Sequence, residues 1–234
     1  MVKKLEPPRR PLPQASYTWC WEPRPSDGEW LWCRVYHRSA HTPNGLTFRR
    51  FGPLSRLDHH HAASPPTVDV TGRRILYVGA NLATSACEVY GEAGVAAVCP
   101  RYRVSIVAPT RGLWMYDLTA PGAAMAIGAL PALGNGSEAR PLTQAWARAI
   151  HEDQPAGPDV CGVRYTTAYD SGLAVALWDC DDGVEIVRDA RGRLQDLPLL
   201  DPRVFSRLEE QMHERLIDVT TVPEAECSQC QTTA

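Results

Sequence analysis

An aromatic hydroxyl and a carboxylate lie in one short segment, residues 74–88, at a spacing that brings both toward a single cleft. Apolar residues alternate over 75–79, which is typical of a half-buried strand. Asn81 follows as an N-cap, and the apolar spacing after it predicts a short helix. On that helix Glu88 lies away from the apolar face, so packing does not explain it. Tyr77 on the strand and Glu88 on the helix are therefore the first candidates for a site.

Strand hairpins and a few helices must position these two groups. The predicted strands cover residues 30–36, 68–78 (a hairpin turning at Thr71-Gly72), 102–108 and 113–118 (a second hairpin across 109–112), 162–167, 173–178 and 184–187. The predicted helices are the one after Asn81, a second over 142–153, and a third that begins at Pro202 with Asp201 as its N-cap. This order of elements predicts an α+β fold, with a mostly antiparallel sheet and helices packed on it.

The chain organisation indicates one folded domain between two tails. We expect a Pro/Arg-rich, irregular or loosely docked tail over 1–27. A single domain is expected over 28–220, followed by a polar tail over 221–234. The length of 234 residues supports one well-filled core and is short for two.

Composition and charge exclude several classes of partner. The hydrophobic share of 44% and the charged share of 22% are ordinary for a soluble globular protein. A formal net charge of −3 provides no basic field that would favour nucleic acid or an anionic membrane surface. We expect neither a membrane span nor a secretory signal. The eight cysteines are therefore expected to be free thiols in a reducing cytoplasm.

Two motifs resemble metal sites, but neither predicts one. The run His59-His60-His61 stands in a Pro/Ser-rich stretch without partner ligands at a known spacing, so we expect a solvated loop. The pair Cys227 and Cys230 has the spacing of half a zinc or redox signature, and a second pair is missing. We expect a free tail there, with a tail docked by zinc as the alternative.

Several motifs in order along the chain resemble the RES domain family, which is named for its Arg, Glu and Ser residues. The resemblance rests on Arg34-Val35, Arg50-Phe51, Leu76-Tyr77, Glu88, Gln144-Ala-Trp-Ala147 and Gly162-Val-Arg-Tyr-Thr-Thr167. It covers roughly residues 30 to 180. It implies a twisted or split antiparallel sheet like that of ADP-ribosyltransferases. It also implies a toxin of a toxin–antitoxin pair that destroys NAD.

The resemblance assigns roles to individual residues. Arg34 resembles the family arginine that grips the NAD phosphates or ribose, with Arg38 as a competing register. Arg50 resembles a second cationic contact. Tyr77 resembles the tyrosine that contacts the nicotinamide riboside, and Glu88 resembles the catalytic acid.

Three further residues complete the predicted substrate site. Tyr36 and Gln144 are expected as additional contacts to NAD or phosphate. Thr167 stands where the family usually has Ser; it keeps the hydroxyl but adds a methyl group that restricts its side-chain rotation.

These residue types suit cleavage of the bond between nicotinamide and ribose. Positive charge spreads over C1′ and the ring oxygen in that reaction, and a carboxylate such as Glu88 stabilises it. Arginines supply bidentate contacts to the pyrophosphate or to an inorganic phosphate nucleophile. Phosphate attack gives ADP-ribose 1″-phosphate and water gives ADP-ribose; the resemblance favours phosphorolysis. NAD is then a substrate, and no cofactor or metal is expected.

The resemblance also implies a protein partner, a small Xre-like antitoxin that covers the NAD cleft, and a homodimer is a further option. Two alternatives remain open. One is an ADP-ribosyltransferase that acts on a macromolecule. The other is a non-catalytic module that binds a nucleotide or a partner.

Overall fold

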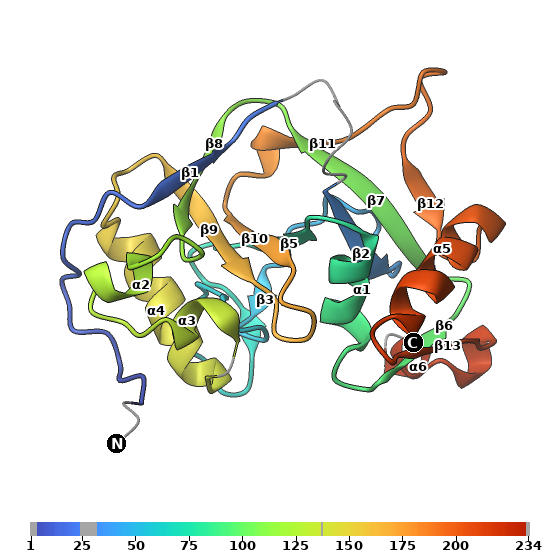
Figure 1. Ribbon diagram of the computed structural model, residues 1–234, viewed down its shortest axis with the longest axis horizontal. Coiled ribbons are helices and arrows are strands. Elements are labelled where there is room, and N and C mark those ends of the chain that lie inside the picture. Colours follow the sequence, from blue (N-terminus) through green and yellow to red (C-terminus); the bar gives the residue numbers. More distant parts are fainter. Residues whose placement is uncertain (1–3, 24–31, 137, 233–234) are drawn as a thin grey trace.

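A nine-stranded, mainly antiparallel sheet forms the centre of the protein (Figure 1). The computed structural model describes residues 4–23, 32–136 and 138–232. The strands of this sheet run in the order β1-β8-β9-β10-β5-β2-β7-β11, with β12 also paired to β7. Their bounds are β1 Thr18–Trp21, β2 Cys33–His37, β5 Ile75–Gly79, β7 Tyr102–Pro109, β8 Leu113–Asp117, β9 Val160–Thr166, β10 Leu173–Trp178, β11 Val184–Ile186 and β12 Asp196–Pro198. Two small ladders lie outside it, β3 Phe51–Gly52 with β4 Thr67–Val68, and β6 Val95–Val98 with β13 Asp218–Thr221.

Helices pack in two groups at opposite ends of the sheet (Figure 1). α2 Ala123–Ala126, α3 Ala132–Asn135 and α4 Arg140–Asp153 lie at the end formed by β8 and β9. α1 Leu82–Tyr90, α5 Pro202–His213 and α6 Ser228–Thr232 lie beside β2 and β7. Two single 3₁₀ turns, η1 Asp181–Gly183 and η2 Glu224–Glu226, complete the order. Within the described ranges, no helix has both the length and the apolar character needed to cross a membrane.

The sheet is divided at the junction between β5 and β2, which we call the seam. β5 pairs with β10 over five residue pairs, and β2 pairs with β7 over another five. Between β5 and β2 the described residues form one pair, Cys33 with Gly79. The molecule therefore consists of two half-sheets that meet along a very short ladder.

The predicted α+β class and the mainly antiparallel sheet are confirmed. The strand at 75–79 and the helix after Asn81 are present, and the Asn81 side chain accepts the N–H of Thr84 as an N-cap. The helix over 142–153 appears as α4, and Asp201 caps α5.

Both predicted hairpins are wrong in their pairing. β7 and β8 follow one another in the chain, but β7 pairs with β2, β11 and β12, whereas β8 pairs with β1 and β9. Likewise β4 pairs with β3 and not with β5. The turn at Thr71-Gly72 is real, since the N–H of Gly72 donates to the Asp69 carbonyl, but it joins two different sheets. The alternation of apolar and polar residues predicts that a segment forms a strand. It does not predict the neighbouring strand, because pairing depends on contacts with distant parts of the chain.

The N-terminal segment, expected to be irregular or loosely docked, is docked and contains a strand where the structure describes it. β1 adds to the sheet edge by pairing with β8. Leu5 and Leu12 are buried in the same core as α4. Arg10 forms ion pairs with Glu152 and Asp153 at the end of that helix. Apolar burial and these ion pairs hold the segment in place despite its prolines. Residues 1–3 and 24–27 of the predicted tail lie outside the described ranges.

The C-terminal segment, expected to be a free tail, is also docked. β13 pairs in parallel with β6, and Cys227 is buried against the core beside α1 and α5. Leu216 lies beyond the end of α5 and is 92% exposed.

Candidate functional site

A cavity of about 510 Å³ opens beside the seam, and Arg34, Tyr77 and Glu88 all line it. This volume lies in the range of small-molecule sites. β2 supplies Arg34, β5 supplies Tyr77, and α1 supplies Glu88. The structure thus brings together, from both half-sheets, the two residues that the spacing singled out and the arginine that the resemblance added.

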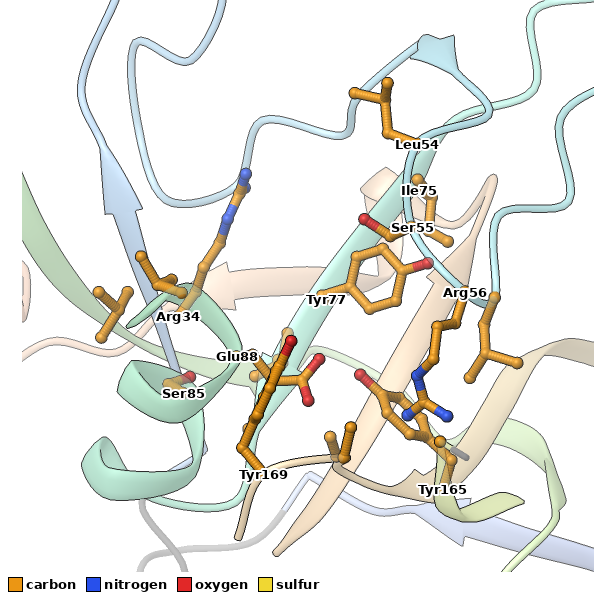
Figure 2. A pocket seen from close by; sticks show the side chains of 18 of the residues that line it. Arg34, Leu54, Ser55, Arg56, Ile75, Tyr77, Ser85, Glu88, Tyr165 and Tyr169 are labelled. Atoms are coloured by element: carbon orange, nitrogen blue, oxygen red, sulfur yellow. The ribbon is translucent and has the colours of Figure 1, made fainter. Parts of the chain in front are cut away.

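Glu88 lies in the cavity wall and faces a group of aromatic and cationic side chains (Figure 2). Burial raises the pKa of this carboxyl above its ordinary value of 4.5. The Arg56 guanidinium and the backbone N–H of Ala168 oppose that effect, but they do not cancel it. The side chain reaches solvent through the cavity, so a carboxylate of raised basicity is open to a ligand.

Three tyrosines surround Glu88 (Figure 2). Tyr77 and Tyr165 meet edge to face, with ring centroids 6.4 Å apart. Tyr165 is buried, and its hydroxyl faces the Glu88 carboxylate. Tyr169 is 45% exposed and lies at the cavity mouth. Aromatic faces with polar edges suit a ligand that has flat rings and hydroxyl groups.

Arg34 brings a positive charge to the wall formed by β2. Its guanidinium donates to the carbonyls of Gly45 and Thr47, at 3.1 and 2.8 Å. Burial, together with the neighbouring charge of Arg49, lowers the pKa of Arg34 to about 10, so it remains charged at neutral pH. Within the described residues no carboxylate forms an ion pair with it, so its charge is available to an anion.

A loop over residues 53–61 forms the opposite wall and is held by a buried carboxylate, Asp58. The side chain of Asp58 accepts the N–H groups of Leu54 and Ser55. It also accepts from Nη2 of Arg49, which lies 2.8 Å from each of its two oxygens. Burial would raise the pKa of Asp58, but Arg49 and these hydrogen bonds lower it below its ordinary value. Arg49 is therefore neutralised, although it lines the cavity.

Arg56, in this loop, is the cation whose charge acts on Glu88. Its Cζ lies 5.2 Å from the centroid of the Tyr165 ring, and one of its nitrogens donates to the Thr166 carbonyl at 3.2 Å. Its other terminal nitrogen is buried without a hydrogen-bond partner in the described part of the chain. An orphan guanidinium donor at a cavity wall is suited to an anionic ligand.

Two of the predicted substrate contacts lie away from the cavity. Arg50 is exposed and extends toward the turn at Gly72. The prediction that Arg50 is a second cationic contact in the cavity is therefore wrong. The neighbouring Arg49 lines the cavity instead. Tyr36 is buried and its hydroxyl donates to Asp196 at 3.0 Å. The competing Arg38 is exposed beyond the end of β2, so Arg34 is the cavity arginine.

The other two predicted contacts support the walls of the cavity and do not line it. Gln144 on α4 donates to the Ser55 carbonyl at 3.0 Å and so fixes the 53–61 loop. Thr167 is buried, and its hydroxyl donates to Asp170, which also accepts the Thr84 hydroxyl from α1. These bonds hold the turn after β9 against the helix that carries Glu88.

Sequence reasoning missed Arg56, Tyr165 and Tyr169 as cavity residues. Tyr165 had a local signal, because it stands in the 162–167 strand motif with its side chain on the face that β5 also presents. Arg56 and Tyr169 lie in loops whose positions depend on distant contacts, so no local pattern marks them.

The prediction that the histidine run lies in a solvated loop is wrong, because His59 and His60 are fully buried. His59 and His151 each donate through Nε2 to one oxygen of Asp179, at 3.0 and 3.1 Å. Burial lowers the pKa of His59 to about 4, so this imidazole is neutral. Although these three side chains lie close enough to hold a metal ion, their hydrogen bonds already account for the arrangement. They anchor the 53–61 loop to the end of β10, next to Trp178.

The family model described as RES domain matches residues 31–200. No curated protein sequence matches the chain. A similar solved structure is a chain of the M. tuberculosis MbcT–MbcA toxin–antitoxin complex. It has 20% sequence identity and a TM-score of 0.46, over 78% of this chain and 90% of that chain.

Proposed function

The chain belongs to the RES domain family, and from this premise we propose that it is an enzyme that consumes NAD by cleaving the nicotinamide–ribose bond. One observation carries the proposal: Glu88 lies in the wall of a cavity among three tyrosines, and two arginines line the same cavity. Arg56 has a buried guanidinium nitrogen without a hydrogen-bond partner among the described residues, and Arg34 donates to backbone carbonyls and forms no ion pair among them. A carboxylate that only contacts solvent would not have aromatic and cationic side chains around it.

The role of Glu88 follows from the positive charge that develops on the ribose when the nicotinamide–ribose bond breaks. The bond between C1′ and the pyridinium nitrogen breaks, and its electron pair leaves with neutral nicotinamide. Positive charge then develops on C1′ and the ring oxygen of the ribose, where the Glu88 carboxylate stabilises it. A phosphate oxygen or water adds to C1′ and completes the reaction. Because the leaving group is neutral, no general acid is required.

The arginines and tyrosines bind the rest of the dinucleotide. The pyrophosphate carries two negative charges, and Arg34 and Arg56 supply planar, permanently charged donors to it. The rings of Tyr77 and Tyr169 offer flat faces to nicotinamide or adenine. Binding of these remote parts holds C1′ against Glu88 and so contributes to the rate.

Purified protein incubated with NAD, with and without inorganic phosphate, tests the proposal. We expect nicotinamide release, and we expect Glu88→Gln to lower its rate by roughly 100-fold or more, in line with loss of an electrostatic stabiliser. The matched control is Glu92→Gln. Glu92 also lines the cavity, but it is exposed and paired with Arg140 at 3.1 Å, so that variant should retain its activity.

The products identify the acceptor. ADP-ribose 1″-phosphate that forms only with phosphate present indicates phosphorolysis, the outcome that the family resemblance favours; ADP-ribose indicates hydrolysis. Label from NAD that appears on a macromolecule would indicate transfer. Equal turnover by Glu88→Gln and wild type would remove Glu88 from the reaction. NAD binding without turnover would contradict the enzyme proposal altogether.

We also propose, from family membership alone, that the protein is a toxin restrained by a small antitoxin protein that covers the cavity. Expression of the wild-type chain should then arrest bacterial growth, and expression of Glu88→Gln should not. Co-expression of a small helix-turn-helix protein encoded beside this gene should restore growth and block NAD loss. Growth arrest by both chains alike would contradict a link between toxicity and the cavity.

A further inference from the structure

Four potential metal ligands converge at the end of the molecule opposite α4, away from the cavity. They are His37, Cys99, Cys227 and Cys230, and their ligand atoms all lie within 4.8 Å of one another. His37 ends β2, Cys99 follows β6, and the two remaining cysteines flank the start of α6. Three segments that are far apart in sequence thus deliver three thiols and one imidazole to one point.

The distances fit a tetrahedral ion. Nε2 of His37 lies 3.2 Å from the sulfur of Cys230, and the sulfurs of Cys99 and Cys230 are 3.7 Å apart. A zinc ion with Zn–S bonds of about 2.3 Å separates two tetrahedral sulfur ligands by about 3.8 Å. The side chains therefore stand near the positions that one bound ion would give them.

The surroundings also match a structural metal site. Cys99 and Cys227 are buried, whereas Cys230 and His37 are partly buried. Cys227 and Cys230 have the Cys-x-x-Cys spacing that is typical of structural zinc sites. The ring of His37 packs edge to face on Tyr102 at 5.1 Å, which fixes its orientation.

We propose that His37, Cys99, Cys227 and Cys230 bind one Zn²⁺ ion in a closed, tetrahedral Cys₃His site. Four protein ligands leave no open position, so the ion is structural. Three thiolates and a neutral imidazole around Zn²⁺ carry a net negative charge. Arg101, two positions after Cys99, lies beside the site, where it pairs with Glu224 at 2.8 Å.

The ion would fasten the C-terminal segment to the domain core. Cys227 and Cys230 lie beyond residues 31–200, the part that matches the RES family model, whereas His37 and Cys99 lie within it. His37 is in the same strand as Arg34, so the ion also anchors the far end of the strand that reaches the cavity. The site thus joins a segment outside the matched domain to the strand that forms one wall of the cavity.

Metal content of the full chain tests the site. Protein purified under reducing conditions in the presence of Zn²⁺, then dialysed against metal-free buffer, should retain about one zinc ion per chain. Cys227→Ser and Cys230→Ser should each lose most of it. Cys87→Ser is the matched control: Cys87 is a buried thiol in the same core but is not one of the four ligands, so this variant should keep its zinc.

Replacement of zinc by Co²⁺ gives a readout of geometry. The Co²⁺ protein should show the intense visible bands of a tetrahedral ion, together with sulfur-to-metal charge transfer. His37→Cys conserves a four-ligand site, so it should still bind the ion and increase the charge-transfer intensity. That variant keeps the test decisive if the serine variants fail to fold, since a merely structural histidine would not produce this change.

Chelation provides the stability readout. A strong chelator should lower the midpoint of thermal unfolding of the wild type and of Cys87→Ser, and added Zn²⁺ should restore it. Wild-type protein without bound zinc and with eight titratable thiols would overturn the proposal. A disulfide among Cys99, Cys227 and Cys230 in the reduced preparation would overturn it as well, in favour of a redox role.

Discussion

The hydroxyl of Tyr77 donates a 2.7 Å hydrogen bond to Oδ1 of Asp58, which is fully buried. This bond connects the central strand β5 to the 53–61 loop, so the two walls of the cavity are fixed to each other. Burial raises the pKa of Tyr77 well above its ordinary value, and the Asp58 charge adds to that effect. The Tyr77 hydroxyl is thus neutral and donates its hydrogen bond to the loop. The face of the Tyr77 ring remains available to a ligand.

Tyr77→Phe should therefore lower the stability of the fold more than it lowers the rate of NAD cleavage. The substitution leaves one lone pair of a buried carboxylate unsatisfied, which costs about 1–3 kcal/mol in the free energy of unfolding. Chemical denaturation of the wild type and the variant measures this loss. Tyr169→Phe is the control, because Tyr169 lies exposed at the cavity mouth. Unchanged stability with abolished NAD cleavage would instead assign the Tyr77 hydroxyl to the reaction.

Arg34→Gln should weaken NAD binding, because it removes a charged donor from the cavity wall. We expect KM for NAD to rise by roughly 10-fold or more, which corresponds to loss of a charge-assisted hydrogen bond of about 1.5–3 kcal/mol. Steady-state kinetics of nicotinamide release measures it. Arg50→Gln removes the same charge from an exposed position outside the cavity and should leave KM unchanged. A similar rise in KM for both variants would restore the sequence prediction that Arg50 also contacts the substrate.

The rate should increase with pH through the titration of Glu88. Burial raises the pKa of this carboxyl, so the ionised form that stabilises positive charge is lost as the pH falls through that raised value. Arg56 lowers the pKa of Glu88, so Arg56→Gln should shift the midpoint of kcat/KM to higher pH. Arg140→Gln, at the exposed ion pair with Glu92, should not shift it. A midpoint that moves to lower pH in Arg56→Gln would contradict the assignment.

Acid should destabilise the fold through His59. Burial lowers the pKa of His59 from 6.5 to about 4, so the unfolded chain binds a proton that the folded chain excludes. Stability is therefore complete above pH 6.5 and declines as the pH falls toward 4, by about 3 kcal/mol at most. Urea titrations at pH 7 and pH 4.5 measure the decline.

His59→Gln should flatten this pH dependence, because glutamine keeps a donor to Asp179 but does not titrate. The groups that face His59 are Asp179, His151, His60 and Trp178. Burial also lowers the pKa of His60, so a smaller decline of the same sign should persist. An unchanged slope would show that His59 is not the main titrating group.

The parts of the fold and site that the sequence predicted correctly depend on local signals. The strand over 75–79, the cap at Asn81 and the helix that carries Glu88 follow from neighbouring residues. Thus the positions of Tyr77 and Glu88 in one cavity could be predicted before any distant contact was known.

What the sequence did not predict depends on contacts across the chain. The backbone of Arg49 bridges to Ile75, and a register difference of one residue decides whether Arg49 or Arg50 faces the cavity. Arg56 reaches Glu88 because Asp58, from its own loop, bonds to Tyr77. The thiol cluster escaped prediction for the same reason, since Cys99 is far from Cys227 in sequence.

Among the described residues, Cys33 and Gly79 form the one pair that joins β2 to β5, and this has a mechanical consequence. One pair resists rotation of the half-sheets only weakly, so the width of the cavity depends on groups that cross the gap. Ser85 of α1 is one of them, since its hydroxyl donates to the Cys33 carbonyl. A molecule held by Arg34 on one side and by Tyr77 on the other would add a further crosslink. The occupied protein should therefore be the stiffer one.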